Sequence, residues 1–276
     1  MIFKIEREDM EDNKFINLIR TLADYVKKIV IFCLPIFKSK FNEIKVVINS
    51  NNELKKRLYY GLILAMIILL SISFGRAVYI ITVFALMCAM FFELLKIISN
   101  IEQKNNELFK IFRCWGLVYI ALFCISLILI RSSQQGLKIS LWMFITIWSV
   151  DSIAYIFGRK IGKLKLAPTI SPNKTYEGAI IGSIGGLFVS MVIYNFFSTS
   201  RINSFSSISF VIFSMIIIIL AQLGDLGESY IKRQCGVKDS GNIIPGHGGV
   251  LDRFDSFLIA APFILIIIWL NGGFLF

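Results

Sequence analysis

The chain has 276 residues, of which 56% are hydrophobic and 17% are charged, and its formal net charge is +11. Soluble domains contain about 25% charged and about 45–50% apolar residues, so this composition excludes an ordinary soluble protein as well as disordered, collagen-like and coiled-coil chains. The five cysteines form no CxxC pair and lie mostly in apolar segments, which favours small hydrophobic residues over a disulfide framework or a metal site. The excess of Lys and Arg suits an anionic lipid surface or a polyanionic substrate.

Seven segments are long and apolar enough, or nearly so, to span a membrane, which takes ~20 residues per helix. They are approximately 58–74, 77–97, 115–130, 139–158, 178–198, 207–224 and 255–273. We therefore predict an all-α, polytopic membrane helix bundle over residues 55–276. Residues 1–54 form a separate N-terminal extension, in which apolar and charged residues between 15 and 29 follow the spacing of an amphipathic helix at the membrane surface.

The distribution of Lys and Arg predicts the orientation. If the basic cluster at 55–57 is cytoplasmic, 16 Lys and Arg residues from this cluster onward fall on the cytoplasmic side and four on the other. By the positive-inside rule, the N-terminus is then cytoplasmic and the C-terminus is outside. The acidic residues from position 53 onward also fall on or near the cytoplasmic side, so we expect any active site there, in the inner (cytoplasmic) membrane.

Asp151 lies within the fourth apolar segment. A carboxylate inside a span costs about 2.5–3.5 kcal/mol on insertion scales, so such a residue faces a bundle interior or a wet cavity. Asp151 either specifies helix packing or forms a polar wall of a substrate cavity. Tyr155, four residues later on the same helical face, is a candidate hydrogen-bond partner.

Residues 171–178 read Ser-Pro-Asn-Lys-Thr-Tyr-Glu-Gly and lead directly into the fifth apolar segment. Helix N-termini present free N–H groups and a positive dipole to anions, so Ser171, Asn173 and Lys174 are candidate phosphate contacts, with an ordinary boundary lysine as the alternative. Three glycines recur every four residues in this helix, a spacing that chiefly favours close helix packing. These are Gly178, Gly182 and Gly186.

Carboxylates are densest between residues 222 and 256. Asp225 and Glu228 lie near the end of the sixth apolar segment, and Asp252 and Asp255 lie at the start of the seventh. Residues three apart share a helical face, and the intervening chain returns to the same membrane side, so the two pairs can meet. Oxygen ligands of this kind suit Mg²⁺, which retains waters and substrate phosphates.

The same region carries cations and glycines that suit a phosphate ligand, although a charged, solvated loop is the alternative. The glycines let a backbone approach a ligand closely. His247, the single histidine, is either a polar structural residue or a substrate contact with an acid–base role. The other candidates are Lys232, Arg233, Lys238, Gly248, Gly249 and Arg253.

The pattern from Ser229 to Asp255, Ser-x-Ile-Lys-Arg-x4-Lys-Asp-x-Gly-x2-Ile-Pro-x-His-Gly-Gly-Val-x-Asp-Arg-Phe-Asp, resembles the signature of the phosphatidate cytidylyltransferase (CDP-diacylglycerol synthase) family. The Asp-Ser-x-Ala-Tyr stretch at 151–155 and the Ser-Pro-x-Lys-x-x-Glu-Gly stretch at 171–178 resemble that family as well. The similarity covers roughly residues 55–276 and leaves the N-terminal extension unexplained.

The resemblance implies a nucleotidyltransferase of phospholipid biosynthesis that converts CTP and phosphatidate to CDP-diacylglycerol and pyrophosphate with Mg²⁺. It implies Asp225 and Asp252 as metal ligands, with Glu228 and Asp151 as further candidates. The catalytic set expected from signature and residues together is Asp225, Asp252, Asp255, Lys238 and His247. The expected partners are CTP, phosphatidate and the lipid bilayer, with no nucleic acid; a second, monovalent cation and a homodimer are left open.

Two other functions remain open at this point. A polyprenol or phytol kinase-like enzyme would use CTP to phosphorylate a lipid alcohol, and its relatives resemble parts of this chain. A cation transporter would place Asp151 and Asp225 along its path, but it predicts acidic residues spread across the membrane depth and does not explain the glycine-rich stretch at 245–249.

Overall fold

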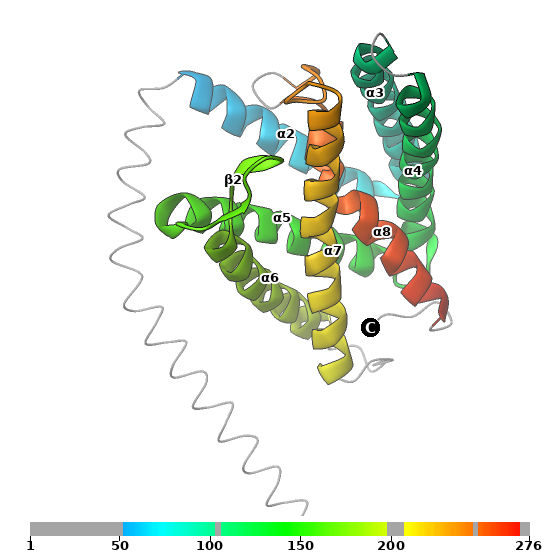
Figure 1. The fold of residues 1–276 in the computed structure, drawn as a ribbon. Helices are drawn as coiled ribbons and strands as arrows, with labels where there is room; N and C mark the ends of the chain where they lie inside the picture. The colour runs from blue at the N-terminus through cyan, green and yellow to red at the C-terminus, as the bar shows by residue number, and fades with distance from the viewer. Residues whose placement is uncertain (1–51, 103–105, 198–206, 245–247, 271–276) are drawn as a thin grey trace, which may run out of the picture. The chain divides into compact units, whose positions relative to one another are not determined.

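A computed structural model describes residues 52–102, 106–197, 207–244 and 248–270, and residues 59–276 form one compact unit. The described part contains seven helices and one two-stranded sheet, shown in Figure 1. The helices are α2 (Asn52–Phe74), α3 (Arg76–Glu102), α4 (Asn106–Ser132), α5 (Gly136–Ile161), α6 (Tyr176–Phe197), α7 (Ser207–Gln234) and α8 (Leu251–Leu270). The predicted all-α bundle is confirmed, and each of the seven apolar segments falls within or largely within one helix.

Six of the described helices are long and apolar enough to cross a membrane. These spans are Arg76–Ser99, Cys114–Ser132, Gly136–Ile161, Tyr176–Phe197, Ile208–Gln234 and Leu251–Leu270. The first predicted span corresponds to a shorter apolar helix, Tyr60–Phe74. Only 22–44% of each span is buried inside the protein, and large apolar side chains such as Phe84, Ile184 and Trp269 are exposed. A surface of this kind suits lipid as the solvent.

The N-terminal extension is largely outside the described residues. The amphipathic helix expected between residues 15 and 29 lies there, and the domain boundary near residue 54 stays a prediction.

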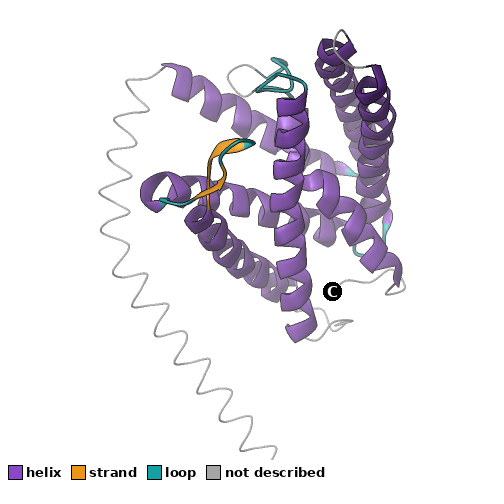
Figure 2. Ribbon diagram, in the orientation of Figure 1, coloured by secondary structure: helices purple, strands orange, loops and turns teal. Residues whose placement is uncertain are grey.

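A small β-hairpin interrupts the helices between α5 and α6 (Figure 2). Its strands, β1 (Lys165–Ala167) and β2 (Ser171–Thr175), pair antiparallel. The hairpin was not predicted, because three- and five-residue strands leave no measurable period in the sequence. The predicted entry into a helix is confirmed: α6 begins directly after β2, and the Thr175 hydroxyl accepts a hydrogen bond from the N–H of Gly178 at 3.2 Å, as a helix N-cap does.

The three glycines of α6 pack closely against α5, as their spacing predicted. A Cβ atom on Gly182 would lie 2.7 Å from the Cβ of Ala154 and 3.0 Å from the carbonyl oxygen of Val150. A Cβ atom on Gly178 would lie 2.8 Å from the Cα of Gly158. Because the facing residues are glycine in α6 and glycine or alanine in α5, the two backbones can approach closely, which brings the end of α5 to the start of α6.

Aromatic packing fixes the first turns of α8. Phe254 and Phe257 are fully buried; the ring of Phe257 lies 4.8 Å from that of Phe144 in α5, and the ring of Phe254 lies 6.1 Å from that of Phe123 in α4. These contacts hold the acidic start of α8, which includes Asp252, between helices that are distant in sequence.

The cysteines behave as apolar residues. The described ones, Cys88, Cys114, Cys124 and Cys235, are free thiols. Burial raises the pKa of the Cys235 thiol, which follows the last residue of α7, to about 11, so this thiol stays neutral. Cys124 and Cys235 are buried, as expected of small hydrophobic residues, whereas Cys114 is exposed.

Candidate active site

A cavity of about 930 Å³ lies where the end of α5, the hairpin, the start of α6, the second half of α7 and the start of α8 meet. Its lining is rich in charged side chains of both signs. The described lining residues are Asp151, Ser152, Ala154, Tyr155, Gly158, Arg159, Gly162, Lys165, Leu166, Ser171, Asn173, Lys174, Thr175, Gly178, Ala179, Gln222, Asp225, Lys232, Asp239, Asp252, Arg253 and Asp255. An ionic cavity at one end of an apolar bundle can hold a charged ligand beside the membrane.

The carboxylates predicted to meet across α7 and α8 do so in part. Asp225, Asp252 and Asp255 all line the cavity. Glu228 instead lines a second cavity of about 370 Å³, which is mostly apolar. Spacing alone does not decide the outcome, because Asp252 and Asp255 are also three residues apart and both line the ionic cavity.

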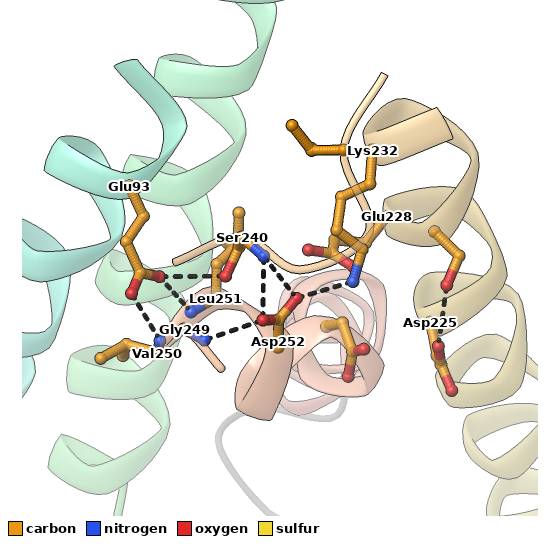
Figure 3. A network of polar contacts seen from close by, with 12 residues as sticks. Glu93, Asp225, Glu228, Lys232, Ser240, Gly249, Val250, Leu251 and Asp252 are labelled. Atoms are coloured by element: carbon orange, nitrogen blue, oxygen red, sulfur yellow. Dashed lines mark hydrogen bonds and ion pairs between the residues drawn. The ribbon is translucent and has the colours of Figure 1, made fainter. Parts of the chain in front are cut away.

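Lys232 joins the two cavities and lines both. Its ammonium forms ion pairs with Glu228, one turn earlier in α7, and with Asp252 of α8, the latter at 2.6 Å (Figure 3). All three charged groups are largely buried, with side-chain exposures of 10%, 5% and 7%. The buried positive charge of Lys232 is therefore neutralised by one carboxylate from α7 and one from α8.

The Asp252 carboxylate also organises the chain that precedes α8. It accepts hydrogen bonds from the N–H of Ser240 at 2.9 Å and from the N–H of Gly249 at 2.8 Å. Gly248 has a φ of +83°, and a Cβ atom there would lie 2.6 Å from Asp252 Oδ2. Glycine meets both requirements, since it tolerates positive φ and has no side chain to displace the carboxylate.

Asp225 is paired with the hairpin. Its Oδ2 lies 2.6 Å from the Lys174 ammonium in β2, with both side chains about one-quarter exposed. Lys174 thus neutralises a carboxylate of α7 at the rim of the cavity, where it also remains accessible to an anionic ligand. Its predicted contact with phosphate stays a prediction.

Asp151 accepts a hydrogen bond from the Ser256 hydroxyl of α8 at 3.1 Å. Tyr155, the partner that helical spacing suggested, was the wrong choice: its hydroxyl accepts a hydrogen bond from Arg159 at 3.2 Å and its side chain is 66% exposed. The close approach of α8 supplies a nearer donor. Asp255 also accepts a hydrogen bond from Ser256, through the backbone N–H at 2.7 Å.

The acidic side chains of the cavity are potential oxygen ligands for a divalent cation. Within the described residues, no three Asp, Glu, Cys or His side chains are grouped tightly enough to enclose a metal ion. Mg²⁺ does not need such a group, because it is bound through one or two carboxylates together with waters and substrate phosphates. Asp151 and Asp255 line the cavity beside Asp225 without an ion-pair partner among the described side chains. These two carboxyl groups are therefore available to a bound cation.

The profile of the cytidylyltransferase family matches residues 28–271, which is most of the chain. The chain belongs to the cytidylyltransferase family.

Individual members of the family are clearly similar to this chain. Proteins named phosphatidate cytidylyltransferase are 46% identical over 129 residues in Haemophilus influenzae, 49% over 135 residues in Staphylococcus haemolyticus and 40% over 183 residues in Bacillus subtilis. These alignments cover 47%, 49% and 65% of this chain and 45%, 50% and 66% of the respective relatives. The chain thus aligns with about half the length of the first two relatives.

The remaining residues that the sequence predicted for the site lie partly inside and partly outside the lining of the ionic cavity. Ser171, Asn173 and Arg253 line the cavity. Arg233 lies outside its lining and donates hydrogen bonds to the carbonyl oxygens of Ile170 and Val237, each at 3.1 Å, so it ties the hairpin to the end of α7. Lys238, Gly248 and Gly249 also lie outside the described lining, and His247 lies outside the described residues.

Glu93 is a buried acidic residue that the sequence analysis did not select. It lies in α3, is 3% exposed, and its carboxylate contacts the chain around Ser240 and the start of α8 (Figure 3). The available signal was the one that selected Asp151, a carboxylate within an apolar segment. Its position between Phe92 and Leu94 satisfies that criterion.

Proposed function

We propose that this protein transfers the cytidylyl group of CTP to phosphatidate, producing CDP-diacylglycerol and pyrophosphate for phospholipid biosynthesis. Membership of the cytidylyltransferase family supports the reaction type. The observation that carries the proposal is the ionic cavity of about 930 Å³ at one end of an apolar helix bundle. It offers a site for a nucleotide triphosphate within reach of a substrate that stays in the bilayer.

The charges of the cavity fit a reaction between two anions. A phosphate oxygen of phosphatidate attacks the α-phosphorus of CTP, the new P–O bond forms, and the bond to the β-phosphate oxygen breaks to release pyrophosphate. The attacking phosphate is already ionised at neutral pH, so the protein need not supply a nucleophile. Lys174 and Arg253 would neutralise the phosphates and hold them in line, which is the main catalytic contribution in transfers of this kind.

We also propose Mg²⁺ as the cofactor, held through Asp225 and Asp252, with Asp151 as a further candidate ligand. Glu228, expected as another candidate, instead lines the apolar cavity and pairs with Lys232. When bound, Mg²⁺ would stabilise the charge that develops on the phosphate oxygens. Asp225 and Asp252 each have a lysine partner, Lys174 and Lys232, so the lysines and the cation together would set the charge around the phosphates.

The six long apolar helices make this a multi-pass membrane protein. The bacterial relatives and the distribution of Lys and Arg support the inner (cytoplasmic) membrane with the site on the cytoplasmic face. CTP would then enter from the cytosol and phosphatidate from the inner leaflet.

Purified protein in detergent, supplied with Mg²⁺, phosphatidate and CTP labelled at the α-phosphorus, tests the proposal. The expected result is transfer of the α-label to the lipid fraction, with an equal amount of pyrophosphate, and complete loss of both when EDTA is added. A CTP-dependent lipid kinase would leave the α-label in soluble CDP and transfer only γ-label to a lipid alcohol. Label that stays wholly in the aqueous phase with protein that binds CTP would contradict the cytidylyltransferase assignment.

A further inference from the structure

Glu93 connects α3 to the segment that precedes Asp252 through three hydrogen bonds. Its Oε1 accepts a hydrogen bond from the N–H of Val250 at 2.9 Å, and its Oε2 accepts one from the N–H of Leu251 at 2.8 Å. The hydroxyl of Ser240 donates to Oε2 at 3.2 Å. Glu93 and the three residues that it contacts are all buried.

A carboxylate is the side chain that these contacts require. Three donors converge on two oxygens, and two of the donors are free N–H groups at the first turn of α8, where the helix dipole also favours negative charge. A glutamine of the same size would turn an NH₂ group toward one of these donors and leave it unpaired. The contacts therefore require the negative charge and the two acceptor oxygens of Glu93, and a side chain of the same size without them would not suffice.

The glycines of the segment make room for this carboxylate. A Cβ atom on Gly241 would lie 2.7 Å from Oε1 of Glu93, and the next two nearest atoms also belong to Glu93. A Cβ atom on Gly249 would lie 2.6 Å from Oε2. Because its three hydrogen bonds fix the carboxylate, it cannot move aside for a methyl group without losing contacts.

Ser240 links Glu93 to Asp252. Its hydroxyl donates to Glu93, while its backbone N–H donates to Asp252 at 2.9 Å. Gly249 donates to Asp252, and the next two residues donate to Glu93 (Figure 3). The two carboxylates thus hold opposite sides of the same backbone segment, and only Asp252 lines the ionic cavity.

We propose that Glu93 is a positioning residue for the reaction: it anchors the backbone at Ser240 and at 249–251 to α3 and thereby fixes Asp252 at the cavity. The effect on the reaction rests on the proposed function, whereas the anchoring itself does not.

Hydrogen–deuterium exchange of the full-length protein in detergent tests the anchoring without any assay of activity. In Glu93→Gln, peptides that cover residues 248–254 should exchange about tenfold to a hundredfold faster, as expected when hydrogen bonds to a charged acceptor are lost. Glu177→Gln is the matched control, since Glu177 accepts a hydrogen bond from Leu164 in another part of the chain and should leave these peptides unchanged. Equal exchange in wild type and Glu93→Gln would overturn the proposal.

Ser240→Ala provides a milder variant if Glu93→Gln does not fold. It removes the hydroxyl contact with Glu93 and keeps the N–H that Asp252 accepts. A smaller increase of exchange in the same peptides is expected, and unchanged exchange would count against the anchoring.

A double-mutant cycle tests the steric argument. Gly241→Ala should accelerate exchange in the wild-type background and add little in a Glu93→Ala background, because the methyl group meets only Glu93 at closest approach. Gly227→Ala is the control, since a Cβ atom there has no neighbour within 4 Å, and it should have no effect in either background. Additive effects of Gly241→Ala and Glu93→Ala would refute the steric relation.

Turnover per folded protein separates positioning from general stability. In Glu93→Gln we expect kcat to fall at least tenfold, with a smaller change in the KM for CTP, at a temperature where the variant is folded. Unchanged kcat despite faster exchange would overturn the role in the reaction. If wild type itself forms no CDP-diacylglycerol, the proposed function fails, and the exchange experiment still decides whether Glu93 anchors the segment.

Discussion

Lys232 is a buried cation whose two partners, Glu228 and Asp252, come from different helices. Removing one member of a buried, hydrogen-bonded set leaves the others without compensation, which costs more than the set contributes when complete. The same lysine thus supports the packing of α7 on α8 and keeps Asp252 at the cavity. Both the stability of the bundle and the position of Asp252 in the site therefore depend on Lys232.

We predict that Lys232→Met lowers the free energy of unfolding by about 3–5 kcal/mol, because two buried carboxylates lose their cation. Thermal unfolding in detergent measures the effect. Lys238→Met is the matched control: Lys238 is exposed and has no ion-pair partner among the described side chains, so its unfolding should be unchanged. Equal unfolding temperatures for the two variants would show that the buried ion pairs contribute little.

We predict that Asp225→Asn and Asp252→Asn each reduce turnover by more than tenfold, an increase of more than about 1.4 kcal/mol in the barrier, since an amide preserves size but loses the charge that holds the cation. The Mg²⁺ concentration at half-maximal rate should rise in any residual activity. A variant that retained more than a tenth of the wild-type rate would exclude that residue as an essential ligand.

The crossing of α5 and α6 sets the shape of the site at the scale of elements. The glycines of α6 bring it close enough to α5 for the hairpin between them to fold over the cavity, where Lys174 reaches Asp225 of α7. Lines of small residues are the general means by which membrane helices approach each other.

We predict that Gly182→Ala destabilises the protein by about 1–3 kcal/mol, because its methyl group would meet the Cβ of Ala154 and the backbone of Val150. Gly185→Ala is the matched control on the same helix: its methyl group would meet only the Ile153 side chain, and the nearest atom is the terminal Cδ1 at 2.6 Å, which can move by rotation about a single bond. Thermal unfolding in detergent should separate the two variants. The packing argument fails if Gly185→Ala is at least as destabilised as Gly182→Ala.

The distribution of Lys and Arg predicts how the whole bundle is oriented in the membrane, and exposed positions between the helices allow this to be tested. Gln134, before α5, and Asn242, between α7 and α8, are both exposed, whereas the neighbouring Ser240 is buried and unsuitable for labelling. We predict that single cysteines at 134 and 242, in a cysteine-free background, react with a membrane-impermeant maleimide from opposite sides, with 242 cytoplasmic. Labelling from the same side would contradict the predicted number of spans between the two positions.

Composition and residue spacing along the chain were enough to predict the class of the protein and the region of its site. Long apolar segments require helices, since every backbone polar group in lipid must be paired internally, so the bundle followed from composition and length. Asp225, Glu228, Asp252 and Asp255 were selected because their spacing lets two pairs of oxygen ligands meet, and three of these four line one cavity. The spacing of the glycines in α6 likewise predicted its close packing.

Which side chains meet depends on how the helices pack, and spacing along the chain did not predict it. Local spacing suggested Tyr155 for Asp151, but the donor is Ser256, which lies 105 residues away in the sequence. Glu228 shares a helix with Asp225 yet lines the apolar cavity, whereas Asp252 and Asp255, with the same spacing, both line the ionic one. Glu93 reaches the start of α8 across more than 150 positions. Such contacts depend on how helices pack against each other, and helical periodicity within one segment carries no information about the neighbouring helix.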